Sequence, residues 1–148
     1  MTVGAKATAM ALTTIWLTAA LVSLHSVPPA EAAAPATVAV RSSAYGSILF
    51  DGRGYVLYAF TRDARGRSTC FGACAAAWPP YRGKGALRAG RGAKRALIGL
   101  TRNGQVTYAG RPLYYYVGDR RPGQILCQDV FEYGGRWLVV RGNGRLVR

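Results

Sequence analysis

Short apolar runs alternate with turns that contain glycine, proline or asparagine along the chain from residue 47 onward. Residues 55–60 form one such run, and the two-residue period of a strand places Tyr58 and Phe60 on the same face. We expect that face to point into the core, because aromatic side chains supply the bulk that a small domain needs. Repeated short strands separated by such turns predict an all-β, mainly antiparallel domain.

Turn and helix signals refine this pattern. Asp51-Gly52 and Asn103-Gly104 each lie between apolar runs and predict hairpin turns, since glycine adopts positive φ without steric cost. Residues 70–78 have the most helical composition, an alanine-rich stretch that Pro79-Pro80 ends. We therefore expect one short Ala-rich helical segment, of one or two turns, among the strands.

The chain also repeats itself. The segment 57–63, Leu-Tyr-Ala-Phe-Thr-Arg-Asp, returns as 113–119, Leu-Tyr-Tyr-Tyr-Val-Gly-Asp, so both copies carry Tyr-x4-Asp behind a leucine. Each copy then leads to a cysteine and a tryptophan. The matched residues are Tyr58, Asp63, Cys70 and Trp78 in the first copy and Tyr114, Asp119, Cys127 and Trp137 in the second. Such a duplication predicts two similar pieces that complete one core.

These signals predict how the chain is organised. We expect a signal peptide in residues 1–34, a leader in 35–46 and a single domain in 47–148. The domain is predicted to contain two pseudo-repeats, at about 47–80 and about 96–148, joined by an exposed basic Gly-rich linker in 81–95.

The N-terminal segment predicts export. Lys6 precedes the apolar run 7–24, and the small residues of 30–34 offer cleavage after Ala32 or Ala34, which is typical of a secretory signal. An uncleaved membrane anchor is the alternative, because the run approaches the length of a spanning helix. No cysteine lies near the cleavage positions, so we expect a secreted or extracytoplasmic protein without an N-terminal lipid.

The charge predicts anionic surroundings. The formal net charge is +14 and the sequence pI is near 10.6. Suitable partners are anionic cell-envelope polymers or a membrane surface. Arginines are scattered between strands and turns, so no specific nucleic-acid site is predicted. A genomic bias toward arginine codons is the other explanation of the composition.

Catalytic residues are scarce. His25, the one histidine, lies in the predicted signal peptide, so no histidine-based catalytic site is expected, and we predict no catalytic residues and no cofactor. Asp63 and Asp119 could form a pair of carboxylates for acid–base work. The simpler interpretation is structural: each accepts backbone N–H bonds in its turn and pairs with a nearby arginine, the candidates being Arg62, Arg65, Arg120 and Arg121.

The tyrosines can be interpreted either as exposed binding residues or as core residues. Exposed rings could stack on sugars or bases, whereas strand alternation favours core positions for Tyr58 and Tyr114. Tyr115 lies on the opposite strand face from Tyr114, which makes it the candidate for an exposed contact.

The three cysteines, Cys70, Cys74 and Cys127, leave three alternatives open. Cys70 and Cys74 can form a local disulfide if the backbone departs from a regular helix. One of them can instead bond Cys127 and join the two halves. All three can hold a soft metal, although a site without histidine or a fourth thiolate is poorly supported, and we predict no metal.

The motifs together resemble a known family. Their residues are Leu57-Tyr58-x-Phe60-Thr61-x-Asp63, Ser68-x-Cys70-x-Gly72-x-Cys74-Ala75-x-x-Trp78-Pro79-Pro80 and Val106-Thr107-Tyr108-x-Gly110-x-Pro112-Leu113-Tyr114-x-Tyr116-x-x-Asp119. This pattern resembles the bacterial secreted repeats with a Tyr-x4-Asp motif, a family of exported proteins and lipoproteins whose function is undefined. The resemblance implies export and a repeat, and this chain differs from the lipoprotein members in lacking the lipid-attachment cysteine.

We therefore expect a secreted, non-catalytic binding or structural module of the cell envelope or extracellular space. The alternative is an extracytoplasmic redox or soft-metal-handling protein that uses the three cysteines.

Overall fold

The computed structural model describes residues 1, 2, 4, 35–83 and 85–148. The predicted signal peptide, 1–34, therefore lies almost entirely outside the described residues. Within the described part of the chain, no helix has the length and apolar character needed to cross a membrane.

Short strands make up most of the regular structure between residues 36 and 139. In chain order the elements are β1 (Ala36–Ser43), β2 (Gly46–Asp51), β3 (Tyr58–Phe60), α1 (Ala73–Ala77), β4 (Leu87–Ala89), η1 (Arg95–Leu97), β5 (Ile98–Leu100), β6 (Val106–Tyr108), β7 (Arg111–Pro112), β8 (Val130–Glu132) and β9 (Gly135–Val139). They form three three-stranded sheets with strand orders β2-β1-β4, β3-β9-β8 and β5-β6-β7. All named pairs are antiparallel except β1 with β4. The all-β prediction is confirmed.

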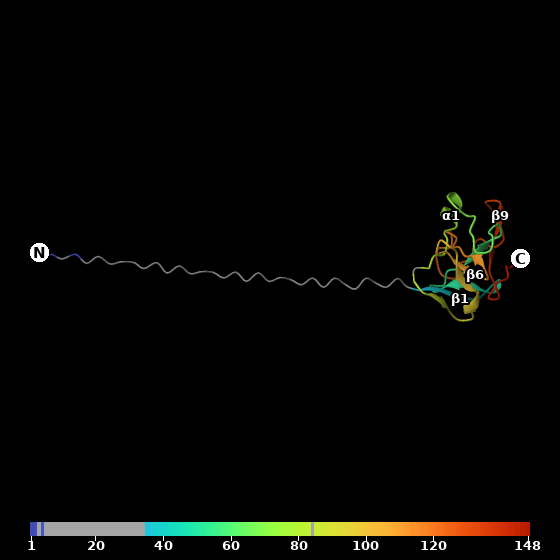
Figure 1. The fold of residues 1–148 in the computed structure, drawn as a ribbon, viewed down its shortest axis with the longest axis horizontal. Coiled ribbons are helices and arrows are strands. Elements are labelled where there is room, and N and C mark those ends of the chain that lie inside the picture. Colours follow the sequence, from blue (N-terminus) through green and yellow to red (C-terminus); the bar gives the residue numbers. More distant parts are fainter. Residues whose placement is uncertain (3, 5–34, 84) are drawn as a thin grey trace. The chain divides into compact units, whose positions relative to one another are not determined.

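The strands are arranged so that the two repeats exchange partners. β3 of the first repeat pairs with β9 of the second, with Phe60 opposite Trp137. Tyr114 of the second repeat in turn bridges Pro80, which follows the tryptophan of the first repeat. Each tyrosine-bearing segment is therefore paired with the tryptophan-bearing segment of the other repeat. In Figure 1, α1 and β9 lie toward one end of the domain and β1 toward the other.

Two buried clusters lie on the two faces of the extended segments that carry Tyr58 and Tyr114. Tyr58, Phe60 and Tyr114 belong to a cluster that includes both buried tryptophans. Leu57 and Leu113 point the other way, into an aliphatic cluster around β1, β2 and β6. Successive side chains alternate between the two clusters, as strand geometry requires. The expectation that Tyr58 and Phe60 face one core together is confirmed.

The predicted helix and hairpins are present. α1 covers five residues, and the backbone N–H of Trp78 closes its last turn on Cys74 before the two prolines. β5 and β6 form an antiparallel hairpin around Asn103-Gly104, with Gly104 at φ +75°. A side chain at that φ is strained, so the glycine makes the tight turn possible.

The segment predicted as a leader, 35–46, is instead mostly β1. This strand is central in its sheet, where it pairs with β2 on one edge and with β4 on the other. Val38 is completely buried in the aliphatic cluster. The leader prediction failed because alanine, threonine and serine weaken the hydrophobic signal of the strand, whose stability comes from backbone pairing on both edges.

The segment predicted as an exposed linker, 81–95, is also partly integrated. Tyr81 is buried, and its hydroxyl donates to the carbonyl of Thr37 at 2.9 Å. β4 pairs in parallel with β1. β4 is held by backbone hydrogen bonds to β1, and the side chains of Arg88 and Ala89 remain exposed. Because side-chain composition does not report such backbone pairing, the segment looked like a linker in the sequence.

Val38→Ala tests whether β1 belongs to the folding unit. We expect the substitution to lower the free energy of unfolding by roughly 1 to 3 kcal/mol, because it leaves a cavity in a closed core. Val117→Ala is the matched control, since Val117 is 54% exposed and its truncation should change stability by less than about 0.5 kcal/mol. Equal effects in urea denaturation would contradict a core role for β1.

Candidate functional site

Two crossed hydrogen bonds connect the repeated motifs. The Tyr58 hydroxyl donates to Oδ2 of Asp119 at 2.7 Å, and the Tyr114 hydroxyl donates to Oδ2 of Asp63 at 2.6 Å. Each tyrosine thus bonds the aspartate of the other repeat. The backbones of the two tyrosines also exchange a reciprocal pair of N–H···O bonds, both 2.9 Å long. The four side chains, Tyr58, Asp63, Tyr114 and Asp119, are named the crossed pairs below.

Each aspartate also closes the loop that follows it. Oδ1 of Asp63 accepts the backbone N–H of Thr69 at 2.7 Å, and Oδ1 of Asp119 accepts that of Leu126 at 3.0 Å. The expected loop-closing bonds are thus observed. The expected arginine partners are not, since the ion pairs among the described residues join Arg53 to Asp51 and Arg136 to Asp129. Tyrosine hydroxyls of the opposite repeat occupy the remaining carboxylate oxygens instead, which sequence neighbours could not indicate.

An aromatic stack lies beside the crossed pairs. The rings of Trp78 and Trp137 are parallel within 4°, with centroids 4.0 Å apart. Phe60 stacks on Trp137, and Tyr116 packs on the other tryptophan at 4.7 Å. Trp78 donates Nε1–H to Glu132, whereas the buried Nε1 of Trp137 has no partner among the described residues. The repeats are therefore similar in packing and different in this polar contact.

Burial controls the ionisation of these groups. It raises the pKa of Asp63 and of Asp119, although the bond from the opposite tyrosine lowers each. Burial, together with the neighbouring carboxylate, raises the pKa of Tyr58 and of Tyr114 well above that of a free phenol. The phenols are therefore held as neutral donors and the carboxylates serve as their acceptors.

This arrangement is that of a structural connection. Asp119 is only 7% exposed, so little of its carboxylate can reach a substrate. A small hollow of about 140 Å³ lies beside Asp63, and its lining does not include Asp119. The geometry therefore favours the scaffold interpretation over a pair of catalytic carboxylates.

Tyr115, expected as an exposed contact, is half-buried. Its ring packs against the aliphatic cluster, edge-on to Tyr81 at 5.3 Å. Its hydroxyl donates to Oδ2 of Asp51 at 2.9 Å. Tyr115 does lie opposite Tyr114, as strand alternation predicted, but the second face of this extended segment is covered by the aliphatic cluster, so the predicted exposed contact is half-buried.

The cysteines adopt the local pairing. Cys70 and Cys74 form a disulfide with Cα atoms 5.3 Å apart, at the start of α1. Cys127 is the free cysteine, buried, and burial raises the pKa of its thiol. Because the disulfide uses two of the three sulfurs, a three-thiolate metal site is not formed. Among the described residues no group of three or more His, Cys, Asp or Glu side chains is placed to hold a metal.

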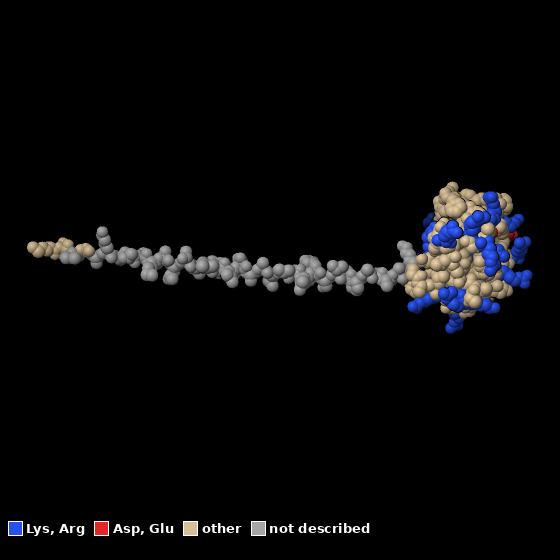
Figure 2. Space-filling model, viewed as in Figure 1, with Lys and Arg blue, Asp and Glu red and all other residues tan. Residues whose placement is uncertain are grey.

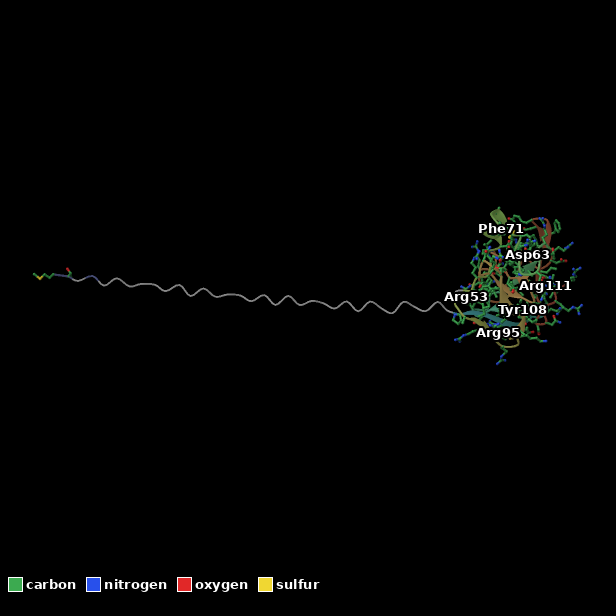
Figure 3. All side chains as sticks on the ribbon, in the orientation of Figure 1. Arg53, Asp63, Phe71, Arg95, Tyr108 and Arg111 are labelled. Atoms are coloured by element: carbon green, nitrogen blue, oxygen red, sulfur yellow. A yellow bond between two sulfur atoms is a disulfide. The ribbon has the colours of Figure 1, made fainter. Side chains whose placement is uncertain are left out.

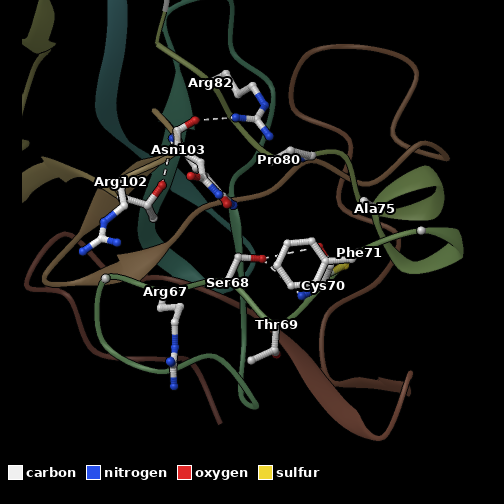
Figure 4. Close-up of a pocket in the computed structure, with 14 residues that line it drawn as sticks. Arg67, Ser68, Thr69, Cys70, Phe71, Ala75, Pro80, Arg82, Arg102 and Asn103 are labelled. Atoms are coloured by element: carbon white, nitrogen blue, oxygen red, sulfur yellow. Dashed lines mark hydrogen bonds between the residues drawn. The ribbon is translucent and has the colours of Figure 1, made fainter.

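An open pocket lies next to the first motif. Its volume is about 560 Å³, and it lies between the disulfide loop, 66–72, and the turn of the β5–β6 hairpin, 101–105. Arg67, Arg82 and Arg102 line it, and none of its lining residues is acidic. Figure 4 shows Arg82 and Asn103 across the hollow from Ser68 and Phe71, with the other two arginines extending from the rim. It is named the arginine-rimmed pocket below.

Asp63 connects this pocket to the crossed pairs. Besides accepting the Tyr114 hydroxyl, its carboxylate accepts the side-chain hydroxyl of Thr69 at 3.0 Å, and Thr69 lines the pocket. Ser68, another lining residue, lies 2.6 Å from the same tyrosine oxygen. The loop that forms one wall of the pocket is therefore held by the second repeat.

A second arginine-lined hollow, of about 490 Å³, lies near residue 148. Its basic lining residues are Arg111, Arg141, Arg145 and Arg148, and its lining includes no aromatic residue. Neither hollow could be predicted from the sequence, because their arginines are separated by up to 37 positions along the chain. The sequence feature that could have indicated these hollows is the recurrence of arginines beside the glycines and asparagines of turns.

Tyr114→Phe tests the crossed pairs. The variant should lose roughly 1 to 3 kcal/mol of unfolding free energy, because the half-buried carboxylate of Asp63 loses its donor. Tyr45→Phe is the matched control, since Tyr45 is 36% exposed and should change stability by less than about 0.5 kcal/mol. Combining Tyr114→Phe with Asp63→Ala in a double-mutant cycle isolates the pair. Additive effects would contradict the proposed coupling.

Alkaline pH should unfold the domain. A phenol ionises near pH 10 in the unfolded chain, whereas burial raises the pKa of Tyr81 to about 12 and those of Tyr58, Tyr114 and Tyr115 further. The folded state therefore holds more protons above about pH 10, and stability falls as pH rises. Urea denaturation with phenolate absorbance measures this. Ionisation of all nine tyrosines near pH 10 without unfolding would contradict it.

Comparison with known sequences identifies the repeats. Two segments, 39–81 and 101–141, match the family described as "Secreted repeat of unknown function". Each matched segment contains one tyrosine and one aspartate of the crossed pairs. No curated protein and no solved structure matches the chain. The matched segments span more than half of the sequence, so the chain belongs to this family of secreted repeats.

Proposed function

We propose that the domain is a non-catalytic extracellular module that binds anionic polymers of the cell envelope. The observation that carries this proposal is the imbalance of charge on the folded domain. Lys6 and Glu31 offset each other, so residues 35–148 retain the formal net charge of +14. Basic side chains are scattered over the face drawn in Figure 2, whereas acidic atoms are visible only near one edge.

Internal contacts engage all five acids of this domain. Asp63 and Asp119 accept the crossed tyrosines, and Glu132 accepts Trp78. The other two form the ion pairs with Arg53 and Arg136. The described acids therefore neutralise few of the arginines, and an anionic polymer would supply the missing counter-charge.

Two observations support a binding role over catalysis. The predicted mature chain has no histidine for a histidine-based site, and Asp63 and Asp119 are bonded to tyrosines. The disulfide occupies two of the three cysteines, which leaves the redox and soft-metal alternative without a specific supporting observation.

Binding to polygalacturonate, a carboxylated polysaccharide, tests this function, with dextran as the neutral control. We expect the domain to bind the charged polymer and not the neutral one. Raising salt from about 0.01 M to about 0.15 M shortens the Debye length from roughly 30 Å to roughly 8 Å and should weaken binding several-fold. No binding in low salt, or equal binding to dextran, would contradict the proposal. Anionic lipid vesicles, tested alongside, show whether a membrane surface competes.

A further inference from the structure

Phe71 places an exposed aromatic ring at the arginine-rimmed pocket. It is 66% exposed and lines the pocket together with Arg67, Arg82 and Arg102. Figure 3 shows it near α1, at the end of the domain where that helix lies. Its backbone carbonyl accepts the N–H of Cys74, so the main chain beneath the ring is held while the ring itself faces solvent.

We propose that the arginine-rimmed pocket binds one acidic sugar residue of a polysaccharide. This inference rests on the proposed function and adds the class of ligand and the site. The apolar face of the sugar ring stacks on Phe71, as aromatic side chains stack on flat or amphipathic ligands. The carboxylate or phosphate of the sugar accepts hydrogen bonds from the arginines, whose guanidinium groups match both anions.

Arg82 is the arginine best placed for this contact. Its Nη1 donates to the carbonyl of Asn103 at 2.6 Å, which fixes the guanidinium over the hollow. A guanidinium has five N–H donors, so most of them remain available to an oxyanion. Arg67 and Arg102 extend from the rim and can contact neighbouring anionic residues of the same polymer. Asn103 and Thr101 supply amide and hydroxyl groups suited to sugar hydroxyls.

The pocket walls are fixed before any ligand binds. One wall carries the Cys70–Cys74 disulfide, and Asp63 holds the same loop through Thr69. The opposite wall is the tight β5–β6 turn, where the Gln105 side chain donates to the carbonyl of Leu113 at 2.9 Å. Fixed walls lower the entropy that a ligand has to overcome on binding.

The second hollow provides an internal comparison. Arg145 lies in an arginine-lined site without an aromatic residue, so it offers charge without a stacking surface. If attraction were only electrostatic, removing one charge from either hollow should weaken binding equally. If the arginine-rimmed pocket binds a sugar ring, loss of an arginine there should weaken binding more than loss of an arginine from the second hollow.

Titration of the full domain with tetragalacturonate tests the site, with binding followed by calorimetry and by chemical shifts. Phe71→Ala, which changes no charge, should weaken binding about tenfold, whereas Phe71→Trp should retain it. Arg82→Gln should weaken binding more than the matched variant Arg145→Gln. Inorganic polyphosphate, which has charge but no ring, should bind Phe71→Ala and the wild-type domain equally. Thermal melts establish that each variant is folded.

The outcomes separate the two proposals. Unchanged tetragalacturonate binding by Phe71→Ala, with equal losses for Arg82→Gln and Arg145→Gln, overturns the sugar site and leaves charge-driven binding intact. Failure of every anionic probe to bind overturns both proposals. Galacturonate and galactose 6-phosphate, compared as monomers, distinguish the two sources of the anion. Chemical-shift changes at Phe71 with either one support the site.

Discussion

The fold depends on an exchange of tyrosine–carboxylate hydrogen bonds between its two repeats. Tyr58 reaches the aspartate of the second repeat and Tyr114 that of the first, around a reciprocal pair of backbone bonds. A repeat alone would leave a buried phenol and a buried or half-buried carboxylate without partners, which is costly in a closed core. The two repeats are therefore needed together, because the tyrosine of each supplies the hydrogen-bond donor for the aspartate of the other.

The hydrogen bonds between the repeats also explain why the surface is basic. Asp63, Asp119 and Glu132 are used inside the domain or at its margin, as acceptors for tyrosine and tryptophan donors. Arginines outside the two ion pairs therefore have no acidic counterpart among the described residues. Asp63 also holds the loop of the arginine-rimmed pocket. The interaction that joins the repeats thus positions the surface on which the proposed ligand binds.

Sequence periodicity predicted the parts of the fold that depend on local signals. Strand alternation placed Tyr58 and Phe60 in one core, and Asn103-Gly104 marked a real hairpin turn. It did not predict β1 as a core strand or Tyr115 as half-buried, because both depend on partners supplied from distant parts of the chain. The crossed pairs were missed for the same reason: spacing identifies a tyrosine and an aspartate in each repeat but not which ones meet.

Native-state amide hydrogen exchange tests most directly whether the two repeats are joined through their reciprocal bonds. The backbone N–H groups of Tyr58 and Tyr114 bond each other's carbonyls, so neither repeat can open there alone. We expect both amides to exchange only through global unfolding, with protection free energies that agree within about 0.5 kcal/mol of each other and of the value from denaturation. Exchange of one tyrosine amide through a lower-energy opening, with the other still protected, would contradict the account.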